Sequence, residues 1–286
     1  HLSIRRQRQM CIRDRSSTGA ITVSNAVSNS TPSNALTFTT TGGNIAFNAA
    51  VSNSGNIGVT LSGAYSGAGA ITSSAGTVTI SGGTTVEPTG AITAAGNVTI
   101  SGSARATFAS QVQSTGGSVS ITAGTVSSTS GGLYFTTGSV LTNAGNITLT
   151  GNALAWWGTY FEDTSRVSST SGNITINGNA PSDVWGIFLT GGEVLSSSGA
   201  IRVDGGTSYG LVMGHLAETD IGSIAPGTIS SSSVTLIGNT YWDSSSPVRI
   251  RTSGPVVIES TGNQFTGATQ ISNHTFSGNS SLRIGK

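Results

Sequence analysis

The sequence of 286 residues has little charge, and it almost lacks lysine and cysteine. Only 8% of its residues are charged, against about 25% in ordinary globular domains, and Lys286 and Cys11 are its one lysine and its one cysteine. The helix formers Leu, Glu and Lys are scarce, which argues against an α-rich fold. No run of 18 apolar residues occurs, so no helix is expected to span a bilayer.

Glycine, serine and threonine make up nearly half of the chain, and β-branched residues recur in short regular groups. Disordered segments share such a bias, but they lack regularly spaced apolar residues and usually carry a high net charge. The formal net charge here is +1. Composition and pattern together predict an ordered, all-β protein.

The first 15 residues differ in composition from the rest. They contain five of the twelve basic residues together with Cys11, and without them the chain has seven basic and ten acidic residues. The string QMCIRDR resembles a translated sequencing adapter. We therefore expect residues 1–15 to be a non-native or disordered basic segment. The sequence pI of about 8.1 then gives no argument for a nucleic-acid partner.

A strand pattern repeats along the chain at intervals of about 20 to 33 residues. In most copies a glycine, often followed by asparagine, precedes a triplet in which two apolar residues flank a third residue that is usually small and polar. This spacing is typical of solenoids and fits neither a β-sandwich nor a propeller. The triplets begin at Ile21, Ile45, Val78, Val98, Val119, Ile147, Ile174, Ile201, Val234 and Val256, with 59–61 and 282–284 as further copies.

The alternation within a triplet predicts one buried face, because Ile147 and Leu149 point to one side and Thr148 to the other. Later units add a second strand, as in Gly132-Leu-Tyr-Phe, and a third, shorter apolar pair. Three short strands per coil predict a parallel β-helix, with residues 16–286 as a single domain. The glycine before each triplet is expected to supply a positive φ or a tight turn at a corner.

The motifs GNVTISG, GNITLTGN and GNITINGN alternate with GLYFTTGSVLTNA and GIFLTGGEVLSSS. Together they resemble the repeat regions of large bacterial surface proteins of the filamentous haemagglutinin and autotransporter-adhesin type, over most of residues 19–260. The resemblance implies a right-handed parallel β-helix, export across the envelope, and an extracellular location at the outer membrane. Since the family's secretion domain and membrane barrel are missing, we expect an internal fragment of a longer repeat protein. The lack of cysteine after residue 15 fits export of an unfolded chain.

Parallel β-helices also occur as polysaccharide lyases and glycoside hydrolases, whose carboxylates or basic groups converge on one face. The acidic residues here are scattered, and Asp163, Asp183 and Asp204 recur at different offsets from the corner glycines. No histidine has a partner at metal-ligand spacing. We therefore expect no enzyme, no metal and no cofactor, with a carbohydrate-active enzyme as the alternative. Arg166 and Glu193 are expected to pair across coils.

Aromatic residues concentrate in the later coils. Trp157, Trp185 and Tyr209 each directly precede the glycine of a second strand, so we expect them to stack. Buried, they would only stabilise the coils; exposed, they would offer flat platforms to sugar rings, with Trp242, Asp183 and Asp204 nearby. The sequence thus predicts a bacterial surface or secreted adhesin or stalk that contacts glycans or proteins of host or neighbouring cells, with a pure spacer as the third alternative.

Overall fold

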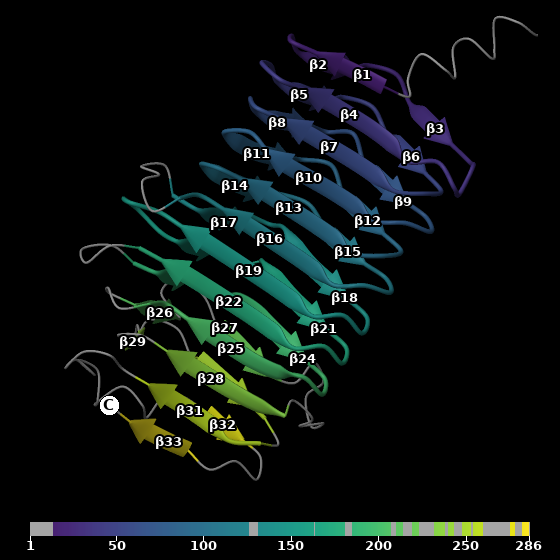
Figure 1. Cartoon of the computed structure of the whole chain (residues 1–286). Helices are drawn as coiled ribbons and strands as arrows, with labels where there is room; N and C mark the ends of the chain where they lie inside the picture. The colour runs from purple at the N-terminus through teal and green to yellow at the C-terminus, as the bar shows by residue number, and fades with distance from the viewer. Residues whose placement is uncertain are drawn as a thin grey trace, which may run out of the picture.

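The computed structural model describes residues 14–125, 131–162, 164–180, 185–206, 210–213, 219–222, 232–237, 240–242, 248–252, 254–259, 275–277 and 282–285. Within these residues, all the regular secondary structure is β-strand. The strands form three sheets, which we call A, B and C. The chain passes from A to B to C and then begins the next coil, an order that holds up to residue 259. Figure 1 shows the coils stacked along one axis, from the purple N-terminal strands to the yellow C-terminal ones. The protein is therefore an all-β parallel solenoid with three strands per coil, as predicted.

The described strands form three sheets of 12, 10 and 11 members. Sheet A contains β1 (Asp14–Ser17), β4 (Leu36–Thr40), β7 (Ile57–Leu61), β10 (Val78–Gly82), β13 (Val98–Gly102), β16 (Val119–Ala123), β19 (Ile147–Asn152), β22 (Ile174–Asn179), β25 (Ala200–Asp204), β28 (Ser233–Ile237), β31 (Val256–Glu259) and β33 (Leu282–Gly285). Sheet B contains β2 (Ile21–Val23), β5 (Ile45–Phe47), β8 (Tyr65–Gly67), β11 (Thr85–Pro88), β14 (Arg105–Phe108), β17 (Leu133–Phe135), β20 (Thr159–Phe161), β23 (Ile187–Leu189), β26 (Leu211–Met213) and β29 (Thr240–Trp242). Sheet C contains β3 (Val27–Asn29), β6 (Val51–Asn53), β9 (Ile71–Ser73), β12 (Ile92–Ala94), β15 (Val112–Ser114), β18 (Ser139–Thr142), β21 (Arg166–Ser169), β24 (Gly192–Ser196), β27 (Thr219–Gly222), β30 (Val248–Arg251) and β32 (Thr275–Ser277).

Strand pairing is parallel throughout the described residues and joins neighbouring coils. Val98 pairs with Val78 on one side and with Val119 on the other. The first residues of the β1 strand, Asp14 and Arg15, belong to the basic segment and pair with β4, whereas residues 1–13 lie outside the described part of the chain. The right-handed sense of the coil stays a prediction.

The core is a set of columns of apolar side chains that run through successive coils. Ile147 and Leu149 are fully buried, while Thr148 between them is half-buried on the outside. Beneath sheet B the columns include a stack of Phe108, Phe135 and Phe161, with ring centroids 5.2 and 4.8 Å apart. Because each column continues from coil to coil, neighbouring coils bury one another's apolar faces.

Two triplets at the N-terminal end belong to a different sheet from the later ones. The triplets that begin at Ile21 and Ile45 form β2 and β5 of sheet B, whereas the corresponding strands of sheet A are β1 and β4. The sequence pattern did not reveal β4, because Asn34 stands two residues before Leu36, where most of the other copies have a glycine. Short triplets in sheets A and B read alike, so their spacing alone does not assign the sheet.

The glycines before the sheet A triplets form a column at the corner between sheets C and A, and the expected positive φ is wrong for them. Among the described glycines, positive φ occurs at other positions. A Cβ on Gly145 would overlap the carbonyl oxygen of Gly117 one coil earlier, and a Cβ on Gly172 would overlap that of Gly145. Close approach of the coils therefore requires glycine here. The corner glycines are Gly55, Gly76, Gly96, Gly117, Gly145, Gly172, Gly199 and Gly254.

Polar side chains at this corner satisfy backbone groups. The Asn146 Oδ1 accepts a hydrogen bond from the Asn173 N–H at 2.9 Å, which explains why asparagine often follows the corner glycine. The buried Ser169 hydroxyl donates to the Gly145 carbonyl at 3.0 Å and accepts from the Gly172 N–H at 2.8 Å. A hydroxyl three residues before the corner glycine recurs in Ser73, Ser114, Thr142, Ser169 and Ser196.

Candidate functional site

Sheet B carries a column of aromatic side chains on its outer surface. Tyr134, Tyr160 and Phe188 lie opposite one another in β17, β20 and β23, and all three are half-buried. The rings of Tyr134 and Tyr160 are 5.0 Å apart, and those of Tyr160 and Phe188 are 5.4 Å apart. With the neighbouring tryptophans they form the aromatic face, which we define as Tyr134, Trp156, Trp157, Tyr160, Trp185 and Phe188.

The strand alternation places these rings outside. In β17 the flanking residues Leu133 and Phe135 are buried, which turns Tyr134 outward. The tryptophans come from the segments between sheets A and B: Trp156 and Trp157 lie between β19 and β20, and Trp185 lies between β22 and β23. The middle residue of each second-strand triplet therefore indicates the outer column. The sequence analysis did not identify Tyr134 and Phe188 as members of a site, although both occupy this middle position.

Trp157 and Trp185 occupy equivalent positions in successive coils. The Gly132 N–H donates to the Trp157 carbonyl at 3.0 Å, and the Gly158 N–H donates to the Trp185 carbonyl at 3.2 Å. The Trp157 ring lies 6.3 Å and the Trp185 ring 6.1 Å from the ring of Phe188. Both tryptophans therefore pack on the outer column of sheet B.

Most of these rings cover one another. Tyr160 and Phe188 are stacked with only 11° between their planes, so their faces are turned toward each other along the rod. Such pairs add about 0.5–1.5 kcal/mol to burial, a purely stabilising contribution. Their stacking leaves mainly the ring edges to solvent.

Trp156 is different, because 61% of it is exposed. Its φ of 71° is the sole positive value among the described non-glycine residues. Such a backbone conformation costs a side-chain-bearing residue about 1–3 kcal/mol, and strained residues of this kind cluster at ligand and active sites. Trp156 thus presents a large apolar ring to solvent from a strained backbone.

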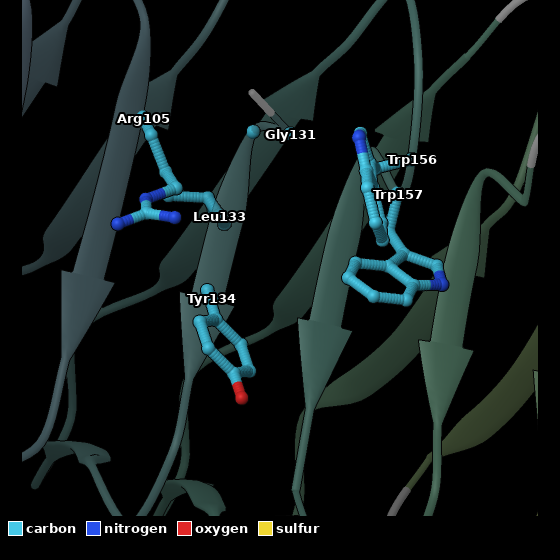
Figure 2. Close-up of a pocket in the computed structure, with 7 residues that line it drawn as sticks. Arg105, Gly131, Leu133, Tyr134, Trp156 and Trp157 are labelled. Atoms are coloured by element: carbon cyan, nitrogen blue, oxygen red, sulfur yellow. The ribbon is translucent and has the colours of Figure 1, made fainter. Parts of the chain in front are cut away.

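A hollow of about 280 Å³ lies beside Trp156 and Trp157. We call this hollow the aromatic pocket. Figure 2 shows Arg105 on one side of β17 and the two tryptophans on the other, with Tyr134 further along the strand. The pocket is lined by Arg105, Gly131, Gly132, Leu133, Tyr134, Trp156 and Trp157. Residues of three successive coils therefore enclose it.

Charges around the pocket are paired. Arg105 Nη2 lies 2.7 Å from Glu87 Oε1, and about 40% of each side chain is exposed, so the pair contributes about 0–1 kcal/mol. The Tyr134 hydroxyl donates to the Glu162 carboxylate. Burial, together with the hydrogen bond and the charge of Glu162, raises the pKa of Tyr134 to about 12, so that its phenol is neutral at physiological pH.

Other predicted site residues lie elsewhere. Asp204 ends β25 of sheet A, where its carboxylate meets Arg202 at 2.6 Å and accepts from the Gly206 N–H at 3.0 Å. Trp242 lies in β29 of sheet B, where its backbone pairs with Met213 of β26. Tyr209, Asp163 and Asp183 lie outside the described residues.

The expected ion pair between Arg166 and Glu193 is confirmed, with Arg166 Nε and Glu193 Oε2 3.4 Å apart on neighbouring strands of sheet C.

Within the described part of the chain, no cluster of three or more His, Cys, Asp or Glu could hold a metal ion. The same residues include no candidate for a membrane-spanning helix.

No protein-family model, no curated protein and no solved structure matches the chain. The chain is therefore classified by its architecture alone. It is a three-sheet parallel β-solenoid with an aromatic face on one side.

Proposed function

We propose that the protein is a bacterial cell-surface or secreted solenoid, an adhesin or stalk without enzymatic activity, that contacts glycans through its aromatic face. The observation that carries the proposal is the aromatic pocket, where Trp156 is largely exposed on the outside of the rod. Pockets lined by aromatic rings with a few polar groups are the usual sites of small ligands. Sugar rings, with apolar faces and polar edges, suit such a lining.

The location and partners follow from the repeats rather than from the pocket. The triplets that resemble haemagglutinin-type surface proteins are the strands of the solenoid, so the resemblance and the fold agree in architecture. On this proposal the protein is extracellular, and its partners are glycans, or glycosylated proteins, of host or neighbouring cells.

The pairing of the carboxylates supports binding rather than catalysis. Glycoside hydrolases place two carboxyl groups about 5–10 Å apart across the scissile bond. Here Glu87 is paired with Arg105 and Glu162 accepts from Tyr134, so these two described acids, which contact residues of the pocket lining, are both engaged by protein groups.

A glycan array tests the proposal. The wild-type protein is compared with the double variant Trp157→Ala/Trp185→Ala and with Thr99→Ala, a matched control on the exposed outer surface of sheet A. We expect a set of glycans bound by wild type and by Thr99→Ala and lost in the double variant, with circular dichroism unchanged. Identical profiles for all three proteins would contradict glycan contact through this face, and an empty wild-type array would favour a spacer.

A further inference from the structure

Trp157 and Trp185 form a row of equivalent positions in successive coils, and the next position of this row toward the N-terminus carries no side chain. Gly131 occupies in its coil the place that Trp157 and Trp185 occupy in the next two coils, as the hydrogen bonds from Gly132 to Trp157 and from Gly158 to Trp185 show. The row of rings therefore ends at Trp157. One coil further toward the N-terminus, a glycine leaves the space of a ring open.

The aromatic pocket is this open space. Among the described residues, a Cβ on Gly131 would have one neighbour within 4 Å, the Trp157 carbonyl oxygen at 3.6 Å, whereas a Cβ on Gly132 would overlap the backbone of Gly158. Gly131 therefore faces the hollow, and Gly132 is packed against the next coil. Gly131 has a φ of 81°, so a larger residue that tolerates a positive φ would fill the pocket rather than disrupt the core.

The width of the space suits one flat ring. Arg105 and Trp157 belong to coils two steps apart, about 9.6 Å along the rod. A ring held between two surfaces needs about 7–8 Å, twice the carbon–carbon contact distance. The Trp157 ring is itself supported by Tyr160, at 4.7 Å, and is a fixed wall.

The charge balance selects the kind of ring. Among the described residues that line the pocket, Arg105 is the one that carries a charge, and Glu87 already matches this charge at 2.7 Å. A guanidinium has five N–H donors, so Arg105 keeps donors for hydroxyl oxygens while offering no unmatched charge to a carboxylate. An uncharged ring with hydroxyl groups at its edge fits this lining better than an acidic one.

We propose that the aromatic pocket is a subsite for a single uncharged pyranose ring, which takes the place of the missing side chain at Gly131 and stacks on Trp157, with Trp156 and Arg105 beside it. This inference rests on the proposed function, because it names the sugar class and the place where the sugar binds. It also gives the exposed ring of Trp156 a role, that of closing the open side of the pocket.

Saturation-transfer difference NMR tests the inference with cellobiose, lactose and N,N′-diacetylchitobiose as neutral probes and digalacturonate as the acidic probe. The variants are Trp156→Ala, which removes a wall, and Gly131→Asn, which fills the space with a residue that tolerates positive φ. Thr99→Ala is the control. We expect at least one neutral probe to bind wild type, and both pocket variants to weaken its binding about tenfold.

Three outcomes would overturn the inference. If both pocket variants bind as wild type does while Trp157→Ala/Trp185→Ala does not bind, the subsite is wrong and the proposed function stands. If the acidic probe binds more tightly than the neutral ones and Arg105→Gln abolishes that preference, the uncharged class is wrong. If neither the probes nor the array shows binding to wild type, subsite and function fall together.

Discussion

Gly172 lies directly over Gly145 of the preceding coil, so closely that a Cβ on Gly172 would overlap the Gly145 carbonyl oxygen. The two backbones sit at the corner where sheet C ends and sheet A begins. Any side chain there has to push two coils apart, and with them the strand pairing on either side.

We therefore expect Gly172→Ala to lower the free energy of unfolding by about 2–4 kcal/mol, as measured by urea denaturation. The control is Gly58→Ala within β7, where the new Cβ would lie 3.8 Å from the Thr37 Oγ1 in ordinary contact. That substitution should be neutral or stabilise by up to about 1 kcal/mol. Equal effects of the two substitutions would show that the corner can relax.

The corner hydroxyl of Ser169 joins the Gly145 carbonyl to the Gly172 N–H. Ser169→Ala leaves both groups buried without this partner, so we expect a loss of about 1–3 kcal/mol in urea denaturation. Ser171→Ala, two residues further along at an exposed position, should change stability by less than about 0.5 kcal/mol. A small loss at both positions would mean that water replaces the hydroxyl.

The Tyr65 hydroxyl is buried and has no hydrogen-bond partner among the described residues. Tyr65→Phe removes this unsatisfied group and keeps the ring against Phe47, so we expect a gain of about 1 kcal/mol. Burial also raises the pKa of Tyr65 above its ordinary value of 10. The unfolded chain then ionises first as pH rises above about 10, and the wild-type fold loses stability there.

The advantage of Tyr65→Phe over wild type should therefore grow above pH 10, as thermal unfolding at a series of pH values would show. A constant difference between the two proteins across that range would contradict the raised pKa.

Trp156 combines an exposed ring with a positive φ. Trp156→Gly relieves the backbone, so we expect thermal unfolding to show a gain of up to about 1 kcal/mol, although a sugar wall is lost. Trp185→Gly is the comparison, since Trp185 contacts Phe188 and has no positive φ. Trp185→Gly should destabilise the protein. If both substitutions destabilise it, the positive φ of Trp156 does not cost measurable stability.

Glu162 influences the ionisation of Tyr134 through a hydrogen bond and through its charge, in addition to the effect of burial. Glu162→Gln removes the charge, so the pKa of Tyr134 should fall from about 12 toward 10. Ultraviolet titration of the phenolate measures the change, with Tyr134→Phe identifying the signal. An unchanged pKa in Glu162→Gln would leave burial and the neighbouring Tyr160 as the causes of the shift.

The sequence predicted the solenoid because its core depends on a local pattern. Val78 and Ile80 face inward and Thr79 outward, and Val78 pairs with Val98 one repeat later, as the triplets indicate. The pairing of Arg166 with Glu193 follows from the same register. What the pattern could not reveal was the distance between coils, which is why the corner glycines were assigned to a positive φ or a tight turn rather than to close approach.

The pocket was beyond the sequence for a similar reason. Trp157 was recognised by its place before a glycine, but the hollow depends on Gly131, a residue whose importance lies in the side chain it lacks. Arg105 reaches the same place from the preceding coil, 26 residues before Gly131. Unequal coil lengths obscure such neighbours until the register is known.

The interior columns are built by strand residues, whereas Trp156, Trp157 and Trp185 stand in the segments that connect sheet A to sheet B. Those connections vary in length from coil to coil while the strands keep their pairing. An organism could thus exchange one connection for another and alter what the rod recognises, with the scaffold inherited unchanged.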